Sequence, residues 1–433
     1  MPARNNGPLF SVDWRPVVFK RIPVSDICIG MFIQELCGSW MDHSFWQTRF
    51  LLQTERDLQR LRGSALHDVW IDTDKGLDVP GGDSFEAVAA VTESVLLAAE
   101  QTPRVKPRPA LDEEVGQALK LCTGIKEGLA QLHQGLRDGE VLNHAQVFEQ
   151  VEAIGDSLLR HPHALLSLTR LRTASEYSYL HALTVSALMI GLARQLQMEP
   201  QQVREAGLAG LLHDIGEVLM PQGLLNTPGK LSKIDSMMLR EHPRLGAKIL
   251  REQGFGEALI DVCLHHHEKP DGSGYPHQLR DAGFSELARM CAICDVYDAL
   301  TCDRPYQKGW DPAEAVRKMA EWSKGQFDEQ LFQAFVKSIG IYPTGSLVRL
   351  QSGRLAVVIE QGETSLLTPV VKVFFSAKSK TPIPQQILDL ARVAGRDKIV
   401  GRESADDWGF RNLEELWVGE RKGRVSLFGP SGT

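Results

Sequence analysis

The strongest chemical signal in the sequence is the segment HHHEKPDGSGYP, residues 265–276. Its histidines His266 and His267 are followed by the carboxylate of Glu268, and the loop after them contains the glycines and proline that allow a sharp bend at a cleft. Imidazole suits iron, manganese, nickel, copper and zinc, and carboxylates widen the choice towards harder ions. The segment therefore indicates a transition-metal site without naming the metal.

Two further motifs carry the same chemistry elsewhere in the chain. They are LLHDIG at residues 211–216 and AICDVYDALTCDRPY at residues 292–306. A lone His-Asp dipeptide carries no weight, and we interpret the second one, His67-Asp68, as a coincidence at a strand edge because it lacks companion ligands. The pattern HHExxDGxGYP at residues 266–276 is far more specific, since it is long and lies in order between the two other motifs.

With these motifs, residues 165–340 resemble the HD-GYP family of the HD-domain superfamily, whose members are metal-dependent phosphohydrolases that characteristically hydrolyse the bacterial second messenger cyclic di-GMP. The resemblance implies the metal ligands His181, His213, Asp214, His242, His266, His267 and Asp295. It assigns Asp214 to bridge two divalent ions, with iron or manganese expected and nickel or zinc as alternatives. Two such ions can activate a bridging hydroxide and neutralise charge on a phosphoryl group.

The same resemblance implies further roles around the ions. We expect Asp298 to hold a ligand histidine or a water, and Glu268 to orient a ligand or fix the loop. Arg304 matches a family position that touches substrate phosphate, a task that suits a bidentate guanidinium, and Lys308 is expected to be a second substrate contact. The predicted catalytic residues are Asp214, Asp298 and Glu217. The last departs from the family, and the sequence leaves open that it is an extra ligand, that it pairs with a nearby arginine or that it signals weak activity.

Two positions depart from the family pattern. The family usually reads HDxGK, but the HDIGE of this chain places Glu217 where a lysine would approach a phosphate or the catalytic water. Some members hold a third metal through a glutamate one helical turn before the first histidine, and this chain has Tyr177 there. We therefore expect a dinuclear site with altered substrate electrostatics.

Three functions follow from these observations. The leading one is hydrolysis of cyclic di-GMP to linear pGpG, with continuation to GMP left open. An alternative is a weakly active or inactive regulatory module that binds nucleotide and recruits GGDEF-type diguanylate cyclase domains through the GYP loop. A third is hydrolysis of another nucleotide by the same centre. A homodimer is also left open.

Composition limits the partners and the location. The 433 residues carry a net charge of −7, which argues against binding of a nucleic acid polymer. The longest apolar run is too short for a membrane span, and the N-terminus has no signal pattern, so we expect a cytoplasmic protein. Seven scattered cysteines indicate reduced thiols, and we interpret Cys291 and Cys294 as core residues of a helix.

The ligands must be positioned by helices. Hydrophobic periodicity, caps and prolines predict helices over residues 175–197, 200–213, 243–253, 257–267 and 285–300. Gly216 is expected to stop the second of them. The spacing of Asp295 and Asp298 places both on one helix face.

The rest of the chain frames this bundle. Residues 17–76 predict a small α/β unit that resembles an uncharacterised domain often found before HD-GYP domains, and the chain after residue 342 predicts a short β-hairpin subdomain. The fold class is therefore mainly α, an HD-type helical bundle between a small N-terminal α/β domain and a short C-terminal β subdomain. The expected parts are a flexible tail (1–16), the α/β domain (17–76), a helical connector (77–164), the HD-GYP catalytic domain (165–341), and the C-terminal β extension and tail (342–433).

Overall fold

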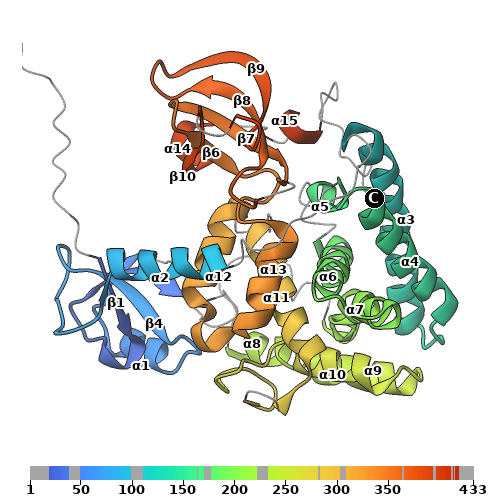
Figure 1. Ribbon diagram of the computed structural model, residues 1–433. Coiled ribbons are helices and arrows are strands. Elements are labelled where there is room, and N and C mark those ends of the chain that lie inside the picture. Colours follow the sequence, from blue (N-terminus) through green and yellow to red (C-terminus); the bar gives the residue numbers. More distant parts are fainter. Residues whose placement is uncertain are drawn as a thin grey trace, which may run out of the picture. The chain divides into compact units, whose positions relative to one another are not determined.

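The structure is a computed structural model, drawn in Figure 1. It describes residues 19–38, 49–98, 111–162, 164–169, 177–221, 233–280, 283–302, 309–362, 365–393, 396–410, 413 and 415–418. The chain divides into two units, residues 1–91 and 92–433, and the boundary falls within helix α2 (Phe85–Ala98). The five parts expected from the sequence are a finer division and stay a prediction.

The first unit is built on an antiparallel sheet of five strands in the order β3-β2-β4-β1-β5. The strands are β1 (Phe19–Pro23), β2 (Phe32–Cys37), β3 (Phe50–Leu51), β4 (Asp68–Asp72) and β5 (Asp83–Ser84). Helix α1 (Glu55–Arg62) begins at Thr54, whose side chain accepts a hydrogen bond from Asp57 N, and buries Leu58 and Leu61 in the core. This is the predicted small α/β unit.

The second unit is mainly a helical bundle. Its helices are α3 (Leu111–Arg137), α4 (His144–Arg160), α5 (Ala164–Thr169), α6 (Tyr177–Gln195), α7 (Pro200–Leu212), α8 (Lys233–Leu239), α9 (His242–Glu252), α10 (Glu257–His265), α11 (Glu286–Thr301), α12 (Pro312–Gln326) and α13 (Glu329–Ile339). The ends of α6, α7, α9, α10 and α11 agree with the predicted helices to within two residues. Cys291 and Cys294 are fully buried in α11, as expected for core residues.

The expected role of Gly216 as a helix stop is wrong. The chain continues after α7 into a 3₁₀ helix, η3 (Ile215–Leu219), and Gly216 lies inside it. A side chain at this position would place its Cβ 2.0 Å from His242 O and 2.6 Å from Gly246 N. The glycine therefore allows α9 to approach η3 closely, and this approach brings His242 towards Asp214.

The C-terminal part is larger than the predicted hairpin. It forms a five-stranded sheet in the order β10-β6-β7-β8-β9. Its elements are β6 (Leu347–Leu350), β7 (Arg354–Glu360), β8 (Val370–Ser376), β9 (Thr381–Asp389), β10 (Ile399–Arg402), α14 (Ala405–Trp408) and α15 (Glu415–Val418). Asp311 joins it to the bundle, because this side chain caps α12 and also accepts a hydrogen bond from Leu347 N at 3.0 Å.

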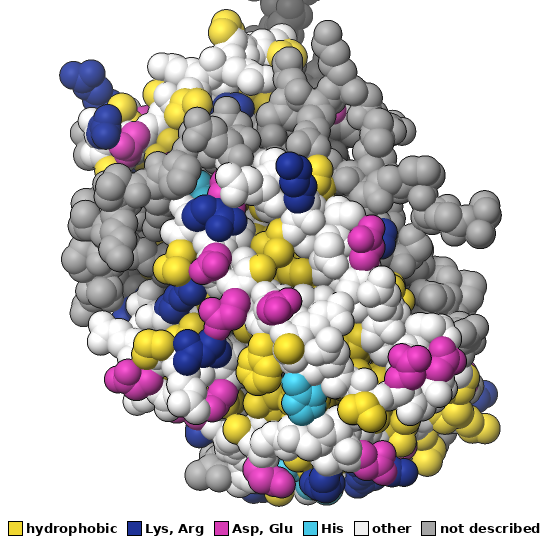
Figure 2. All heavy atoms as spheres, turned by 90° about the vertical axis from the view of Figure 1, so that its right-hand side faces the viewer, with side chains coloured by type: hydrophobic (Ala, Val, Ile, Leu, Met, Phe, Trp, Pro, Cys, Tyr) yellow, Lys and Arg dark blue, Asp and Glu magenta, His cyan; other side chains and the backbone are white. Residues whose placement is uncertain are grey.

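One face of the described surface is mixed in charge. On the face drawn in Figure 2, the described basic and acidic side chains are interspersed with hydrophobic ones, rather than forming the continuous basic surface of a nucleic-acid-binding protein. No helix in the described part of the chain combines the length and apolar character that a membrane span requires.

Helices α6 and α7 pack backbone against backbone. A Cβ at Gly210 would lie 2.8 Å from Ser186 Cα and 2.9 Å from Ser186 N. We expect Gly210→Ala to lower the free energy of unfolding by about 1–3 kcal/mol or more, because backbone cannot move aside as a side-chain tip can. Chemical denaturation of the full chain measures this value.

A matched glycine in α6 provides the control. A Cβ at Gly191 would meet nothing within 4 Å. Gly191→Ala should be neutral or stabilise by up to about 1 kcal/mol, since alanine favours a helix interior. Equal stability of the two variants would contradict the close-packing account.

Candidate metal centre

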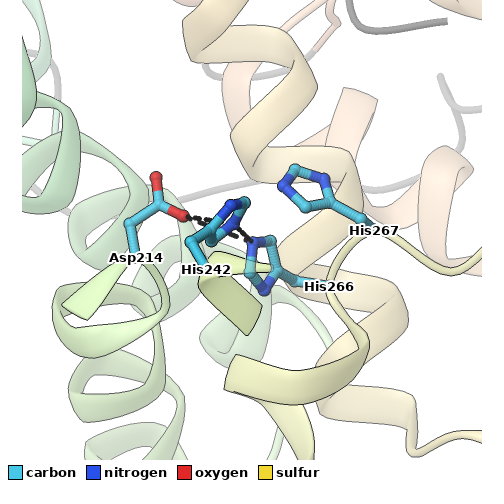
Figure 3. Close-up of side chains that lie close together, drawn as sticks. All are labelled: Asp214, His242, His266 and His267. Carbon is cyan, nitrogen blue, oxygen red and sulfur yellow. Dashed lines mark hydrogen bonds and ion pairs between the residues drawn. The ribbon is translucent and has the colours of Figure 1, made fainter. Parts of the chain in front are cut away.

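Candidate ligand atoms from distant parts of the chain converge in two adjacent groups. One group contains Asp214, His242, His266 and His267, and the other contains His181, His213 and Asp295. Within each group the atoms lie within 4.8 Å of one another. These are all the ligands predicted from the sequence, and they come from α6, the end of α7, the start of α9, the end of α10 and the middle of α11. Figure 3 shows the Asp214 carboxylate pointing towards His242 and His266.

Asp214 directs one oxygen towards each group. Its Oδ1 lies 3.2 Å from His242 Nε2 and 3.3 Å from His266 Nε2. Its Oδ2 lies 3.3 Å from His213 Nε2 and 3.6 Å from His181 Nε2. A carboxylate in this position can ligate an ion in each group through different oxygens.

Three of the histidine rings are fixed by carbonyls at the ends of helices. His213, His242 and His266 each donate Nδ1–H to the carbonyl three residues earlier in the chain. The acceptors are Gly210, Leu239 and Cys263, at 2.9, 2.6 and 2.9 Å. The last carbonyls of a helix have no partner within it, so they are free to accept these bonds. Because Nδ1 carries the proton, the lone pair of Nε2 faces the ligand groups.

His181 is fixed by a carboxylate instead. Its Nδ1 lies 2.6 Å from Asp298 Oδ2, and its Nε2 lies 3.2 Å from Asp295 Oδ1. The two aspartates share one face of α11, as their spacing predicts, and contact opposite nitrogens of the same ring. Cys302 Sγ donates to Asp298 Oδ1 at 3.2 Å. Asp298 therefore positions a candidate ligand and is not placed as a ligand itself.

The charges of the centre favour a cation. Burial alone would raise the pKa of Asp214, but the facing imidazoles, His213 first, hold that pKa well below its usual range. Burial, reinforced by the neighbouring His266 and His242, lowers the pKa of His267 well below its usual value. The centre thus combines an ionised carboxylate with a neutral ring, the forms in which both groups bind metals.

Unpaired atoms show that the residues fit a metal. Among the described residues, the buried atoms His213 Nε2, Asp214 Oδ1 and Asp295 Oδ2 have no hydrogen-bond partner. Leaving such atoms buried and unpaired costs about 1–3 kcal/mol each. Imidazole nitrogens and carboxylate oxygens together suit divalent transition metals, so an ion in each group would satisfy these atoms. The cluster is compatible with divalent metal binding.

Glu217 lies on η3, one turn after Asp214, but belongs to neither ligand group. Burial and the negative charge of Asp214 raise the pKa of Glu217 to about 7. The structure does not place it as a further ligand, so its influence on the centre is electrostatic. The predicted substrate contacts Arg304 and Lys308 lie outside the described residues, as does the side chain of Tyr177.

Comparison with known proteins places this chain in a family. A domain of unknown function (DUF3391) matches residues 19–147, and an HD domain matches residues 155–331. The chain is 53% identical over 413 residues to the cyclic di-GMP phosphodiesterase PA4108 of Pseudomonas aeruginosa, with 95% of this chain and 98% of the relative covered. The chain belongs to the HD-GYP family. It is an enzyme of the phosphodiesterase class, as the motifs predict.

Other proteins match a smaller part of the chain or match it at lower identity. The 3′3′-cGAMP-specific phosphodiesterase 1 of Vibrio cholerae is 29% identical over 225 residues, which are 48% of this chain and 52% of the relative. Among solved structures, Bd1817, an HDG"Y"P protein from Bdellovibrio bacteriovorus, matches at 21% identity and a TM-score of 0.40, with 73% of this chain and 98% of that chain covered.

The loop that gives the HD-GYP family its name is anchored beside the ligands. Glu268 accepts hydrogen bonds from His277 N at 2.6 Å and Leu279 N at 3.0 Å. The ring of Tyr275 stacks on His267 with the ring centroids 4.7 Å apart. Of the two roles expected for Glu268, the structure shows that it fixes the loop.

The sequence predicts Asp298 as a residue that holds a ligand histidine, and the structure places it against His181. Sequence reasoning missed the three backbone carbonyls, which no side-chain motif reveals, and the Cys302 thiol behind Asp298. The position of the histidines could have revealed these partners. His213 and His266 occupy helix C-cap positions, where unpaired carbonyls are available.

The role of Asp298 can be tested through ion retention. Asp298→Asn should weaken ion binding roughly 10- to 100-fold, because the carboxylate that orients His181 and increases its basicity is lost. Metal content at increasing chelator concentration measures the effect. The exposed Asp156→Asn is the control, and equal chelator sensitivity of the two variants would contradict the assignment.

Proposed function

We propose that this HD-GYP protein hydrolyses cyclic di-GMP to linear pGpG, with a second hydrolysis able to continue to GMP. The observation that carries the proposal is the position of Asp214, with one carboxylate oxygen directed towards each group of ligands. The substrate is supported by the name of the Pseudomonas relative, which is a cyclic di-GMP phosphodiesterase and matches this chain over 98% of its own length.

The proposed centre is dinuclear. Two divalent ions, iron or manganese with nickel or zinc as alternatives, would supply a water of lowered pKa and neutralise charge on the phosphoryl oxygens. Asp214 would contact both ions, and the other candidate ligands would divide between them as the two groups do. The helix-end carbonyls and Asp298 keep the Nε2 lone pairs directed inwards.

The bonds that form and break in the reaction define what the site must do. Water adds to phosphorus, and the bond from phosphorus to one 3′ oxygen breaks. That oxygen leaves with a proton, and the phosphate stays on the 5′ oxygen of the neighbouring nucleoside. One such step opens the ring, and a second separates the two nucleotides.

Asp214→Ala tests the proposal directly. Removing the shared carboxylate should abolish ion loading and reduce hydrolysis of cyclic di-GMP by more than the roughly 10- to 100-fold expected for a residue that only orients a ligand. Metal analysis coupled to product chromatography measures both quantities. The exposed Asp138→Ala is the control, and unchanged hydrolysis in Asp214→Ala would refute the proposed mechanism.

Glu217 favours a second candidate function. Its acidic side chain lies near the centre where the family usually has a lysine, so it opposes an approaching phosphate. The alternative is a regulatory module that binds nucleotide with weak or no turnover and recruits GGDEF-type diguanylate cyclase domains through the GYP loop. Binding of cyclic di-GMP by the metal-loaded protein without product formation would favour this alternative.

The charge of Glu217 can be removed without changing its shape. At a pH well above 7, where Glu217 with its pKa of about 7 is ionised, Glu217→Gln should lower the KM for cyclic di-GMP about five-fold, because a repulsion on the order of 1 kcal/mol with the phosphates is lost. Ion content should stay the same, since Glu217 belongs to neither ligand group. The exposed Glu252→Gln is the control. A raised KM, or a loss of ions, would show that Glu217 contacts substrate or metal directly.

The proposal also covers related substrates and partners. The 3′3′-cGAMP-specific relative supports testing a panel of cyclic dinucleotides for preference. Recruitment of GGDEF domains, a homodimer and a cytoplasmic location remain predictions from the sequence.

A further inference from the structure

A second histidine cluster lies beside the metal centre but outside both of its ligand groups. It consists of His265 and Asp261 on α10 and His277 after the GYP loop. His265 Nε2 and His277 Nδ1 lie 3.1 Å apart, and the ring centroids lie 5.4 Å apart at an interplanar angle of 63°. Neither histidine is used by the proposed reaction.

Asp261 fixes the orientation of the first ring. Its Oδ1 lies 2.7 Å from His265 Nδ1, and its Oδ2 accepts a hydrogen bond from Ser285 N at 3.2 Å. Because a carboxylate opposite Nδ1 holds the proton there, Nε2 of His265 presents its lone pair to His277. A carboxylate behind a histidine in this way is the usual support of a metal-ligating imidazole.

We propose that His265 Nε2 and His277 Nδ1 form a separate, exchangeable binding site for a divalent transition metal such as zinc, nickel or copper. Two nitrogens 3.1 Å apart, each about 2.0–2.1 Å from an ion, subtend an angle of about 95–102° at that ion. This angle lies between the square-planar and tetrahedral values, so the pair fits the geometries that copper, nickel and zinc adopt.

The site is open to solvent on one side. The side chain of His265 is 13% exposed, and His277 is an exposed residue. Water can therefore complete the coordination of an ion held by the two rings. An ion with few protein ligands and access to water exchanges with the medium, unlike one enclosed in the buried centre.

The site is connected to the centre through the loop. His277 N donates to Glu268 Oε1 at 2.6 Å, and Glu268 follows directly after the ligand pair His266-His267. An ion joining His265 to His277 would therefore tie the end of α10 to the segment after the GYP loop. Occupancy of the site would restrain the loop whose Tyr275 covers His267.

Zinc binding to matched variants tests the proposal. The full-length, metal-loaded protein is dialysed to equilibrium against buffered Zn²⁺, and bound zinc is measured by elemental analysis. Wild type should bind one zinc per chain more than His277→Ala, since both retain the ligands of the buried centre. Asp261→Asn should keep this extra zinc but need roughly 10- to 100-fold more free Zn²⁺ to bind it.

A histidine elsewhere on the surface provides the control. His144, which lies 2.8 Å from Gln253 O and stacks on Phe255, has no second histidine facing it among the described residues. His144→Ala should bind as much zinc as wild type. Equal zinc binding by wild type and folded His277→Ala, with circular dichroism confirming the fold, would overturn the proposal and leave an ordinary hydrogen bond between the two rings. This outcome would not affect the proposed hydrolysis, because that reaction depends on Asp214.

Discussion

The candidate metal centre depends on carbonyl groups that helices leave unpaired at their C-terminal ends. Helices α7, α8 and α10 all end at the centre, and each directs a carbonyl to the Nδ1 of a ligand histidine. One interaction thereby satisfies the helix end, fixes the ring and selects the tautomer. The C-terminal ends of helices also carry partial negative charge, so three of them meeting at one point favour a cation there.

The distances between ligands depend on close approaches of the backbone. Gly216 lets the start of α9 reach η3, and a Cβ at Gly246 would lie 2.4 Å from Cys263 Sγ of α10. These contacts bring His242, Asp214 and His266 within reach of one ion although they belong to different helices. Such packing leaves ionised and unpaired groups buried together, so ion binding would contribute directly to the stability of the bundle.

Much of this arrangement could be predicted from the sequence, because the ligands are side chains and their helices show clear periodicity. The carbonyl partners could not, since every residue has a carbonyl and only the fold decides which one lies behind a ring. Gly216 was misread because a glycine that follows a helix can either end the helix or allow another backbone segment to approach closely. The C-terminal sheet was underestimated because β9 contains Pro382 and Pro384, which obscure a strand pattern but are tolerated on an edge strand such as this one.

The candidate metal centre is lined by negative charge, so metal ions would have to bind before it could attract a phosphodiester. Among the described residues, four acidic side chains form or border the two ligand groups: Asp214, Asp295, Asp298 and Glu217. Without ions these groups would repel a phosphodiester, and Glu217, where the family usually has a lysine, would add to the repulsion above its pKa of about 7. Bound divalent ions would reverse the local sign, so in the proposed mechanism the affinity for substrate would be coupled to the occupancy of the metal sites. With Glu217 at this position, the ions alone would have to attract the phosphates, a task that they would share with a lysine in other members of the family.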